Sequence, residues 1–545
     1  MSLPARTIPD VPEDTAHVAR AAFRKGNLYM QMRDLFGSLY RDDVFADVYP
    51  VDGQPAVRPW RLALVTVMQF AENLSDRQAA EAVRDRIAWK YALSLELTDT
   101  GFDFSVLSEF RQRLLGHEAG ERLLTEVLEQ FKARGLVKAR GQQRTDATHV
   151  LAAVRDLSRL ENVGQTLRHA LNELARVAPD WLQAWAPVEW YDQYGPRFDL
   201  YRLPKGEAAR RALAEQIGQD GFRLLKAIAG ASDQPQLGRL TAVQTLRQVW
   251  LQQYWCDQGR VRQREVNQMP PVGAWLRSPF DREARYGAKR TTEWVGYKAH
   301  LTETCDEASP RLITHVETRV AAEPDSAVTT TVLDDLAALD LLPATHLVDA
   351  GYVEAAHLVA SQSAHQVELL GPAPQDQSWQ ARSEGGLTQA QFVLDWDAQR
   401  VTCPSGQSSL SWERNRSAHG QPLIRVGFAP AVCQACHLRR QCTRGAARQL
   451  TLLPQALHSA LLTARQRETT LAFKTRYRQR AGVEGTLSQA VRVAGLRRSR
   501  YVGLAKTHLQ NLVIATALNV IRAVAWLNNV PLAPTRISRF AALAP

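Results

Sequence analysis

Residues 346–353 read HLVDAGYV. The apolar run ends at Asp349 and Gly351 supplies a turn directly after it, so the stretch predicts a short strand that ends at a carboxylate. The preceding residues 328–342, VTTTVLDDLAALDLL, have a helical period, and Pro343 separates them from the strand. A helix followed by a strand is typical of an α/β core.

Further strands are expected upstream of this unit. Residues 294–304 and 311–320, WVGYKAHLTET and RLITHVETRV, alternate apolar and polar side chains and predict a hairpin. Residues 135–154 gather Val and Thr after a Gly/Gln break, which predicts a strand ending at Thr145-Asp146. The sequence therefore predicts an α/β fold for the central part of the chain.

Two blocks interrupt this α/β pattern, and helices flank it. We expect a helical N-terminal domain over 1–137, a catalytic domain over 138–530 and a C-terminal tail over 531–545. Within the catalytic domain we expect a helical block over 157–262 and a polar, strand-like block over 370–455. No internal repeat stands out.

The composition indicates a globular protein with an anionic partner. The chain has 545 residues, with 67 Lys and Arg against 56 Asp and Glu, a net charge of +11. Its polar first residues do not resemble a signal peptide, which predicts a cytoplasmic protein. The apolar residues 511–527 contain Asn519 and Arg522 and fall short of the roughly 20 apolar residues of a membrane span, so they predict a core helix and no membrane contact.

The N-terminal helices resemble a helix-turn-helix module. Ser75 can cap a helix over DRQAAEAV, and residues 105–115, SVLSEFRQRLL, form a second helix that carries Arg111 and Arg113. A helical bundle without DNA contact remains an equally good interpretation.

Three carboxylates stand where a metal site could use them. Asp146 and Asp349 end predicted strands, and Glu484 lies on a predicted helix. Phosphoryl transfer on DNA uses two divalent cations about 4 Å apart, and Mg²⁺ prefers carboxylate ligands. Each residue alone is more simply a cap, a turn residue or a solvated side chain.

The surroundings of Glu484 favour the metal site. Residues 465–506 carry eleven Lys and Arg against Glu468 and Glu484 alone. In a continuous helix, Tyr477, Arg480 and Glu484 would share one face and could address one phosphate together.

Four segments together carry a resemblance to a known family: RTDATHV, FDREARYGAKRTTEWVGYKAHLTET, HLVDAGYV and the run from Tyr477 to Arg522. They resemble the DDE transposases of bacterial insertion sequences, most closely the branch numbered eleven eighty-two. The resemblance implies a ribonuclease-H-like catalytic core, preceded by an all-helical domain, with Asp146, Asp349 and Glu484 as ligands of two Mg²⁺ or Mn²⁺ ions. Because the spacings between these residues exceed those of a minimal core, the helical block and the Cys-containing β-rich block would be insertions.

The resemblance also carries a signature of Tyr, Arg, Glu and Lys. Tyr477, Arg480 and Glu484 match its first three positions, whereas Val491 stands where Lys is expected and Arg492 follows it. Other candidate DNA ligands share a basic side chain near these motifs: Arg497, Arg498, Arg500, Lys506, Arg285 and Lys298. His300 resembles a family position too, although a strand surface explains it and Lys298 equally well, and Thr148 and His149 are interpreted as local hydrogen-bonding residues.

Four of the six cysteines cluster in the second block. Cys403, Cys433, Cys436 and Cys442 resemble the pairing of a zinc ribbon, with a CxxC pair at its centre. Four reduced thiols are the alternative, and His437 could compete as a ligand. Arg439, Arg440 and Arg444 surround the cluster, while Cys256 and Cys305 are interpreted as core residues.

The sequence thus predicts an insertion-sequence transposase. It would bind the inverted repeats of its element as a homodimer, cleave double-stranded DNA and join the ends to target DNA in a bacterial nucleoid. A catalytically inactive DNA-binding relative and a nuclease of the same fold without strand transfer are the alternatives.

Overall fold

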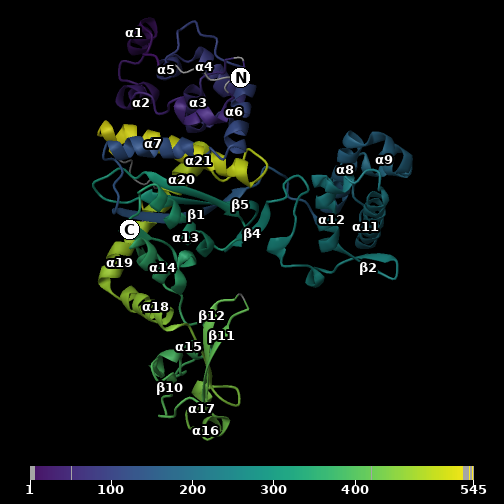
Figure 1. Cartoon of the computed structure of the whole chain (residues 1–545), viewed down its shortest axis with the longest axis vertical. Helices are drawn as coiled ribbons and strands as arrows, with labels where there is room; N and C mark the ends of the chain where they lie inside the picture. Colours follow the sequence, from purple (N-terminus) through teal and green to yellow (C-terminus); the bar gives the residue numbers. More distant parts are fainter. Residues whose placement is uncertain are drawn as a thin grey trace.

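The structure is a computed structural model that describes residues 7–50, 52–53, 55–418, 420–531, 539–540 and 543. Most of the expected tail, 531–545, lies outside these residues. Figure 1 shows a central body that carries the sheet, a lateral lobe and an elongated lower module.

The N-terminal helices bury apolar side chains at helical spacing, mostly in one shared core, whereas Ala19 of the first helix packs in a smaller cluster with Met30, Ala88 and Tyr91. The helices are α1 (Glu13–Ala22), α2 (Leu28–Phe36), α3 (Pro59–Ala71), α4 (Asp76–Asp85), α5 (Ile87–Ala92), α6 (Ser105–Gly116) and α7 (Arg122–Ala133), with a short 3₁₀ turn, η1 (Asp43–Val48). The Ser75 hydroxyl caps α4 in a capping box with Gln78, as the sequence predicted.

The central sheet has six strands in the order β4-β5-β1-β7-β8, with β6 paired to β5. The strands are β1 (Gln142–Leu151), β4 (Arg285–Lys289), β5 (Thr292–Thr304), β6 (Ile313–Val320), β7 (Thr345–Leu347) and β8 (Glu368–Leu370). β5 runs antiparallel to β1, β4 and β6, whereas β7 runs parallel to β1 and to β8. The expected hairpin over 294–304 and 311–320 is therefore confirmed as β5 and β6.

Helices connect and cover these strands. α13 (Thr329–Ala338) joins β6 to β7, and α14 (Ala355–His365) joins β7 to β8. Four C-terminal helices follow, namely α18 (Gln455–Glu468), α19 (Leu471–Tyr477), α20 (Gly482–Ala494) and α21 (Leu504–Leu527), with the 3₁₀ turn η9 (Arg478–Ala481) between α19 and α20. This arrangement is a mixed α/β fold, as the sequence predicted.

One hydrophobic core joins the N-terminal helices to the sheet. α21 packs against β6 on one side and against α3 and α7 on the other, so it lies between the two (Figure 1). Trp60 of α3, Phe110 of α6 and Ile514 of α21 belong to a single buried cluster that also contains Val316 of β6.

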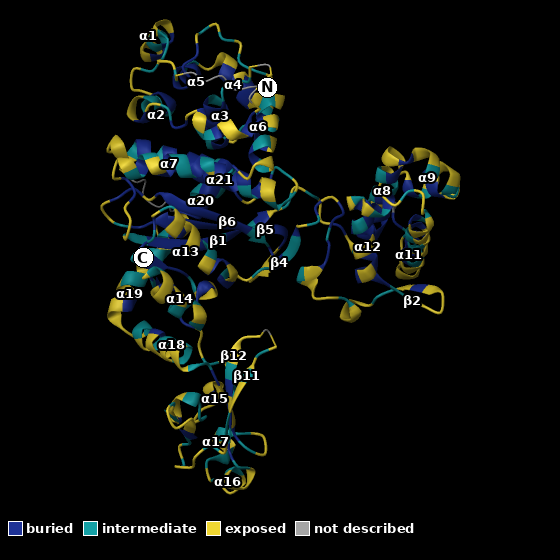
Figure 2. Cartoon of the chain, in the orientation of Figure 1, coloured by how far each residue is buried: buried dark blue, intermediate teal, exposed yellow. Residues whose placement is uncertain are grey.

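α21 is also long and apolar enough to cross a membrane. However, 78% of its most apolar window is buried in the protein, and Figure 2 shows the helix covered from both sides. Its burial is that of a core helix, as predicted for residues 511–527.

The lateral lobe lies between β1 and β4 in the chain and has a separate core around Trp250, Leu246 and Leu167. Its helices and strands are α8 (Arg159–Val177), α9 (Pro179–Trp185), α10 (Glu189–Tyr194), α11 (Glu207–Gly230), α12 (Thr241–Gln253), β2 (Tyr254–Asp257) and β3 (Arg260–Gln263), with short 3₁₀ turns at Leu200–Arg202, Leu237–Arg239, Val266–Gln268 and Val272–Ala274.

The lower module lies between β8 and α18 and has a third core around Val401, Val426 and Leu452. It consists of α15 (Trp379–Arg382), β9 (Val393–Asp395), β10 (Arg400–Thr402), β11 (Ser411–Arg416), β12 (Pro422–Gly427), α16 (Pro430–Gln434), α17 (Arg439–Cys442) and β13 (Gln449–Leu452), with a 3₁₀ turn at Gln389–Gln391. β9 pairs with β10, and β11, β12 and β13 form a three-stranded sheet.

Candidate active site

Asp146 lies within β1, and Asp349 lies just beyond the end of the neighbouring strand β7. Arg144 of β1 pairs with Leu347, the last residue of β7, in parallel register, and Asp146 and Asp349 each follow two residues later. β7 ends at Leu347, so the flank of β1 at Asp146 has no strand partner there and faces the chain around Asp349. The expectation that Asp146 ends its strand is wrong, because β1 continues to Leu151 through pairing with β5.

A tight turn fixes Asp349. The Asp349 carboxylate caps the 3₁₀ turn η7 (Ala350–Tyr352) by accepting a hydrogen bond from the Gly351 N–H at 2.8 Å. A Cβ at Gly351 would lie 3.0 Å from Asp349 Oδ1, so a side chain there would crowd the carboxylate. The buried Tyr352 hydroxyl lies 2.7 Å from His300 Nδ1, which anchors the turn to β5 and gives His300 an internal role.

Arg480 links the first strand to the C-terminal helices. Its Nη1 lies 3.0 Å from Asp146 Oδ2, and its Nη2 lies 3.6 Å from Glu484 Oε1. The continuous helix expected for Tyr477, Arg480 and Glu484 is wrong, because α19 ends at Tyr477 and the 3₁₀ turn η9 contains Arg480. Tyr477 stacks on Phe473 with ring centroids 5.3 Å apart.

The electrostatics of the site favour a bound cation. Burial raises the pKa of Asp146 and the charge of Asp349 adds to this rise, while the Ala147 amide and Arg480 oppose it. Burial also raises the pKa of Tyr477, with Asp349 and Asp146 contributing. Two adjacent carboxylates in a partly buried setting are the oxygen donors that Mg²⁺ prefers, so this pair fits a divalent cation.

The Glu484 side chain is far more exposed to solvent than that of Asp146. Its side chain is 68% exposed, compared with 10% for Asp146. Among the described residues, Asp146, Asp349 and Glu484 do not form a group whose ligand atoms all lie within 4.8 Å of one another.

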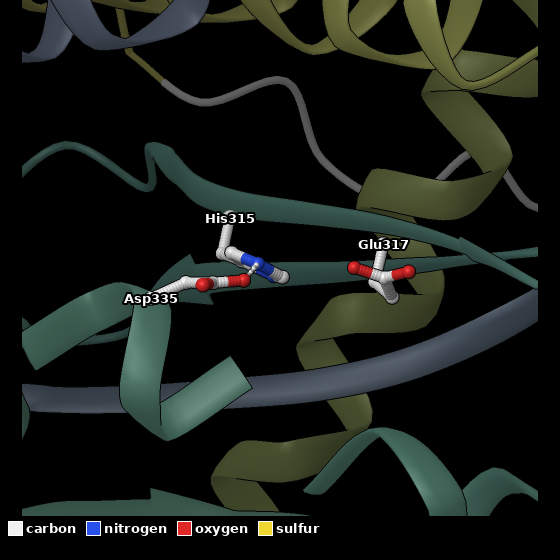
Figure 3. Close-up of side chains that lie close together, drawn as sticks. All are labelled: His315, Glu317 and Asp335. Atoms are coloured by element: carbon white, nitrogen blue, oxygen red, sulfur yellow. Dashed lines mark hydrogen bonds and ion pairs between the residues drawn. The ribbon is translucent and has the colours of Figure 1, made fainter. Parts of the chain in front are cut away.

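Another group of side chains, His315, Glu317 and Asp335, does bring its possible ligand atoms within 4.8 Å of one another (Figure 3). His315 Nε2 lies 2.9 Å from Asp335 Oδ2, and Glu317 Oε1 lies 2.9 Å from Nε of Arg319. Since each carboxylate already has a basic partner, we interpret this cluster as an ion-pair network between β6 and α13.

The candidate DNA ligands fall into two groups. Arg492, Arg497, Arg498 and Lys506 are exposed, and Arg497 Nε donates to Thr148 Oγ1 at 3.0 Å. His149, next to Thr148, packs against the Trp294 ring at 5.5 Å.

The second group has partners within the protein. Lys298 Nζ lies 2.9 Å from Asp325 Oδ1, and Arg285 donates to the carbonyl of Ala284 at 3.1 Å. Arg500 packs its guanidinium over the Phe70 ring at 4.3 Å and donates to the Leu74 carbonyl, so it joins the C-terminal segment to α3.

In the N-terminal module, the helix α6 does not present both of its arginines to solvent. Arg111 is buried, forms a two-pronged ion pair with Asp76 and lies over the Tyr501 ring at 5.1 Å. Arg113 lies over the Tyr49 ring at 4.9 Å. Both contacts favour the interpretation of α6 as part of a packed helical bundle.

Sequence reasoning missed a buried network behind the site. The Glu303 side chain has no exposed surface and lies 2.6 Å from Arg144 Nη2 and 3.0 Å from Arg522 Nη1. Arg144 also donates to the Gln479 carbonyl in η9, directly before Arg480. Arg144 lies two positions before Asp146 on the same face of β1, and that alternation is the signal that could have found it.

Asp325 was also missed. Its pKa is lowered, because hydrogen bonding and the charge of Lys298 outweigh burial. Its Oδ2 lies 3.4 Å from the position of a Cβ on Gly351, which brings it beside the Asp349 turn. Lys289 lies 3.9 Å from Asp325 and lowers the pKa of Asp146, so it adds a basic group that no motif indicated.

Comparison with protein families supports this architecture. A family model described as a transposase DDE domain matches residues 402–524, and one described as a transposase domain (DUF772) matches residues 17–113. The first match includes Glu484, whereas Asp146 and Asp349 lie outside both. No curated protein matches the chain. Transposase domains thus lie on both sides of the central strands, and these two matches support a DDE transposase of an insertion sequence.

Proposed function

We propose that this protein cleaves the ends of its own insertion sequence and joins them to target DNA. The observation that carries the proposal is the link from Arg480 to both Asp146 and Glu484, with Asp349 close enough to Asp146 for its charge to act on that carboxyl. Asp146 lies on a strand, Asp349 on a turn just beyond the neighbouring strand and Glu484 on a helix, and Arg480 contacts Asp146 and Glu484. Three such carboxylates suit a nuclease centre for phosphoryl transfer.

Asp146 and Asp349 are proposed as the principal metal ligands, and Glu484 as the ligand that completes the site. Two Mg²⁺ or Mn²⁺ ions would neutralise charge on the attacking and leaving oxygens of an in-line displacement. The Gly351 N–H holds the Asp349 carboxylate in place, and the network of Glu303 and Arg144 supports the turn that carries Arg480.

Arg480 has two roles in this proposal. The guanidinium forms ion pairs with Asp146 and Glu484. A divalent cation held by those carboxylates would compete with the guanidinium, which would then donate to a non-bridging phosphate oxygen of the scissile strand. Tyr477, stacked on Phe473, would position the same strand.

DNA would lie across the basic surface beside this site. Arg492, Arg497, Arg498 and Lys506 are exposed there and are proposed to bind phosphates. We further propose a homodimer that holds two element ends, and a cytoplasmic, nucleoid-associated location, because these accompany end joining on bacterial DNA. The lateral lobe and the lower module are proposed as insertions into the core, as in the branch numbered eleven eighty-two.

Excision of a marker tests this function. The marker is flanked by the DNA that borders the gene, and wild-type protein is compared with Asp349→Asn in Mg²⁺. Excision and reintegration by the wild type alone support the proposal. End binding without cleavage indicates an inactive DNA-binding relative, and cleavage without joining indicates a nuclease; either outcome overturns it.

A further inference from the structure

The lower module brings four cysteines to one pocket. Cys403 follows β10, Cys433 and Cys436 lie in and after α16, and Cys442 ends α17. All four are free thiols and half-buried, and they line one pocket with Leu387 and Phe428 among others. Cysteines from three separate elements thus converge on one place in the module.

Turn geometry brings the two cysteine loops together. The Gly406 N–H donates to the Cys403 carbonyl at 2.8 Å, which closes the Cys403-Pro-Ser-Gly turn, and Gly406 has φ +78°. Ser405 Oγ of this turn lies 3.2 Å from Cys436 Sγ of the other loop. The loops therefore touch at the mouth of the pocket.

The sulfur atoms also have the surroundings of metal-binding thiolates. The Arg448 N–H points at Cys433 Sγ from 3.5 Å, and such N–H donors stabilise sulfur that carries charge. A bound cation would remove the repulsion that four neighbouring thiolates exert on one another.

The lower module has a small hydrophobic core, which explains why it would need a stabilising cross-link at this pocket. Among the described residues, its buried apolar side chains number only seven: Phe392, Val401, Ile424, Val426, Phe428, Leu450 and Leu452. A core of this size supplies little stability, and small modules commonly add a metal or disulfides. Cys403, Cys433 and Cys442 pack at the edge of this core, so a cross-link there would extend it.

We propose that Cys403, Cys433, Cys436 and Cys442 bind one structural Zn²⁺. Tetrahedral Zn²⁺ with Zn–S bonds of about 2.3 Å holds its sulfur atoms about 3.8 Å apart. Among the described residues, no three of these sulfurs lie within 4.8 Å of one another. Zinc binding therefore rotates the cysteine side chains inward about their Cα–Cβ bonds, with the two turns already formed.

The ligand set is complete without histidine. His437 is exposed and does not line the pocket, so it is excluded as the fourth ligand in favour of Cys442. Four thiolates leave no open position on the metal, which makes the site structural and separate from the carboxylate centre.

The zinc content of the purified full-length protein tests the proposal without any activity measurement. The interpretation of Cys256 as a core residue is wrong, because its side chain is exposed on β2, outside the module. We expect one zinc per chain in the wild type and in Cys256→Ser. The double variant Cys436→Ser/Cys442→Ser should lose the metal. A wild type that holds no zinc, or a double variant that keeps all of it, overturns the proposal.

Because the double variant could fail to fold, thiol reactivity of the wild type supplies a second readout. Titration with a thiol reagent should modify four further cysteines after a zinc chelator is added, and cobalt in place of zinc should show thiolate charge-transfer absorption. Four thiols that react equally fast before and after chelation contradict the site, as do two disulfides found by mass analysis. Neither result bears on DNA cleavage, so failure of this proposal is distinct from failure of the proposed function.

Discussion

Arg480 Nη1 lies 3.0 Å from Asp146 Oδ2, which joins a turn near the C-terminus to the middle of the first strand, 334 residues earlier. The same guanidinium lies 3.6 Å from Glu484, so one side chain touches two of the three candidate metal ligands. Because the candidate ligands come from distant parts of the chain, this contact holds β1 and the turn before α20 together.

Removing Arg480 should shift the pH dependence of cleavage. Arg480 opposes the rise that burial causes in the pKa of Asp146. In Arg480→Ala the pKa of Asp146 therefore rises further, the carboxylate protonates at a higher pH, and the acid limb of the cleavage rate moves upward. A pH–rate profile measures this shift. Arg480→Lys should move the limb less, and Arg478→Ala, an exposed neighbour, should leave it in place; an unchanged limb in Arg480→Ala contradicts the assignment.

The buried Glu303 should be essential for stability. It pairs with Arg144 and Arg522 without any exposed surface, so Glu303→Gln leaves two guanidinium groups without a charged partner. Loss of one partner from a buried pair costs about 3–5 kcal/mol, and urea unfolding should show a loss of that size. The matched control is Glu307→Gln, an exposed residue four positions on, which should change the unfolding free energy by less than about 0.5 kcal/mol. Equal stability of the two variants would refute the network.

Arg498 and Arg500 should separate DNA binding from stability. Arg498 is exposed, so Arg498→Ala should weaken binding to all DNA sequences and lower the salt slope of affinity by about 1 without a change in melting temperature. Arg500 packs over Phe70 and donates to Leu74, so Arg500→Ala should cost about 1–2 kcal/mol of stability. Binding titrations over a salt series and thermal melts measure both. The opposite pattern would reverse the two roles.

His508 should make stability depend on pH. Burial lowers the pKa of His508, but the hydrogen bond and charge of Glu121 outweigh it, so the folded pKa lies above the ordinary 6.5. A raised pKa means that protonation stabilises the fold: the contribution is fully present below pH 6.5 and is lost as pH rises through the folded pKa. Melting temperatures across this range should fall for the wild type and much less for Glu121→Gln. Parallel curves for the two proteins would exclude the ion pair.

The sequence predicts much of the fold because its signals are local. The hairpin of β5 and β6, the capping box at Ser75 and the buried helix α21 follow from alternation, a cap and an apolar run. The prediction ends β1 too early because Thr145 to His149 are mostly polar. Polar side chains are tolerated within the sheet where they form hydrogen bonds with side chains of the neighbouring strand, as Thr145 Oγ1 does with Thr302 Oγ1 at 2.7 Å.

The site was less predictable, because it depends on contacts between distant segments. Motifs indicated Asp146, Asp349 and Glu484, but the pairing of Glu303 with Arg144 and Arg522 has no local signature. Lys298 and Arg500 lie in basic motifs, yet partners elsewhere in the chain engage both side chains. Whether a basic residue faces solvent or a distant carboxylate is decided by tertiary packing rather than by its neighbours in the sequence.

The most direct test of the central claim is cleavage of DNA that carries the element ends, by purified protein in Mg²⁺. The account predicts nicking at the ends by the wild type, and a loss of at least about 10²-fold in Asp146→Asn and Asp349→Asn with DNA affinity unchanged. Glu354→Gln, five residues beyond Asp349 at the start of α14, is the matched control and should cleave normally. Undiminished cleavage by either aspartate variant would contradict the assignment of these two carboxylates as the catalytic centre.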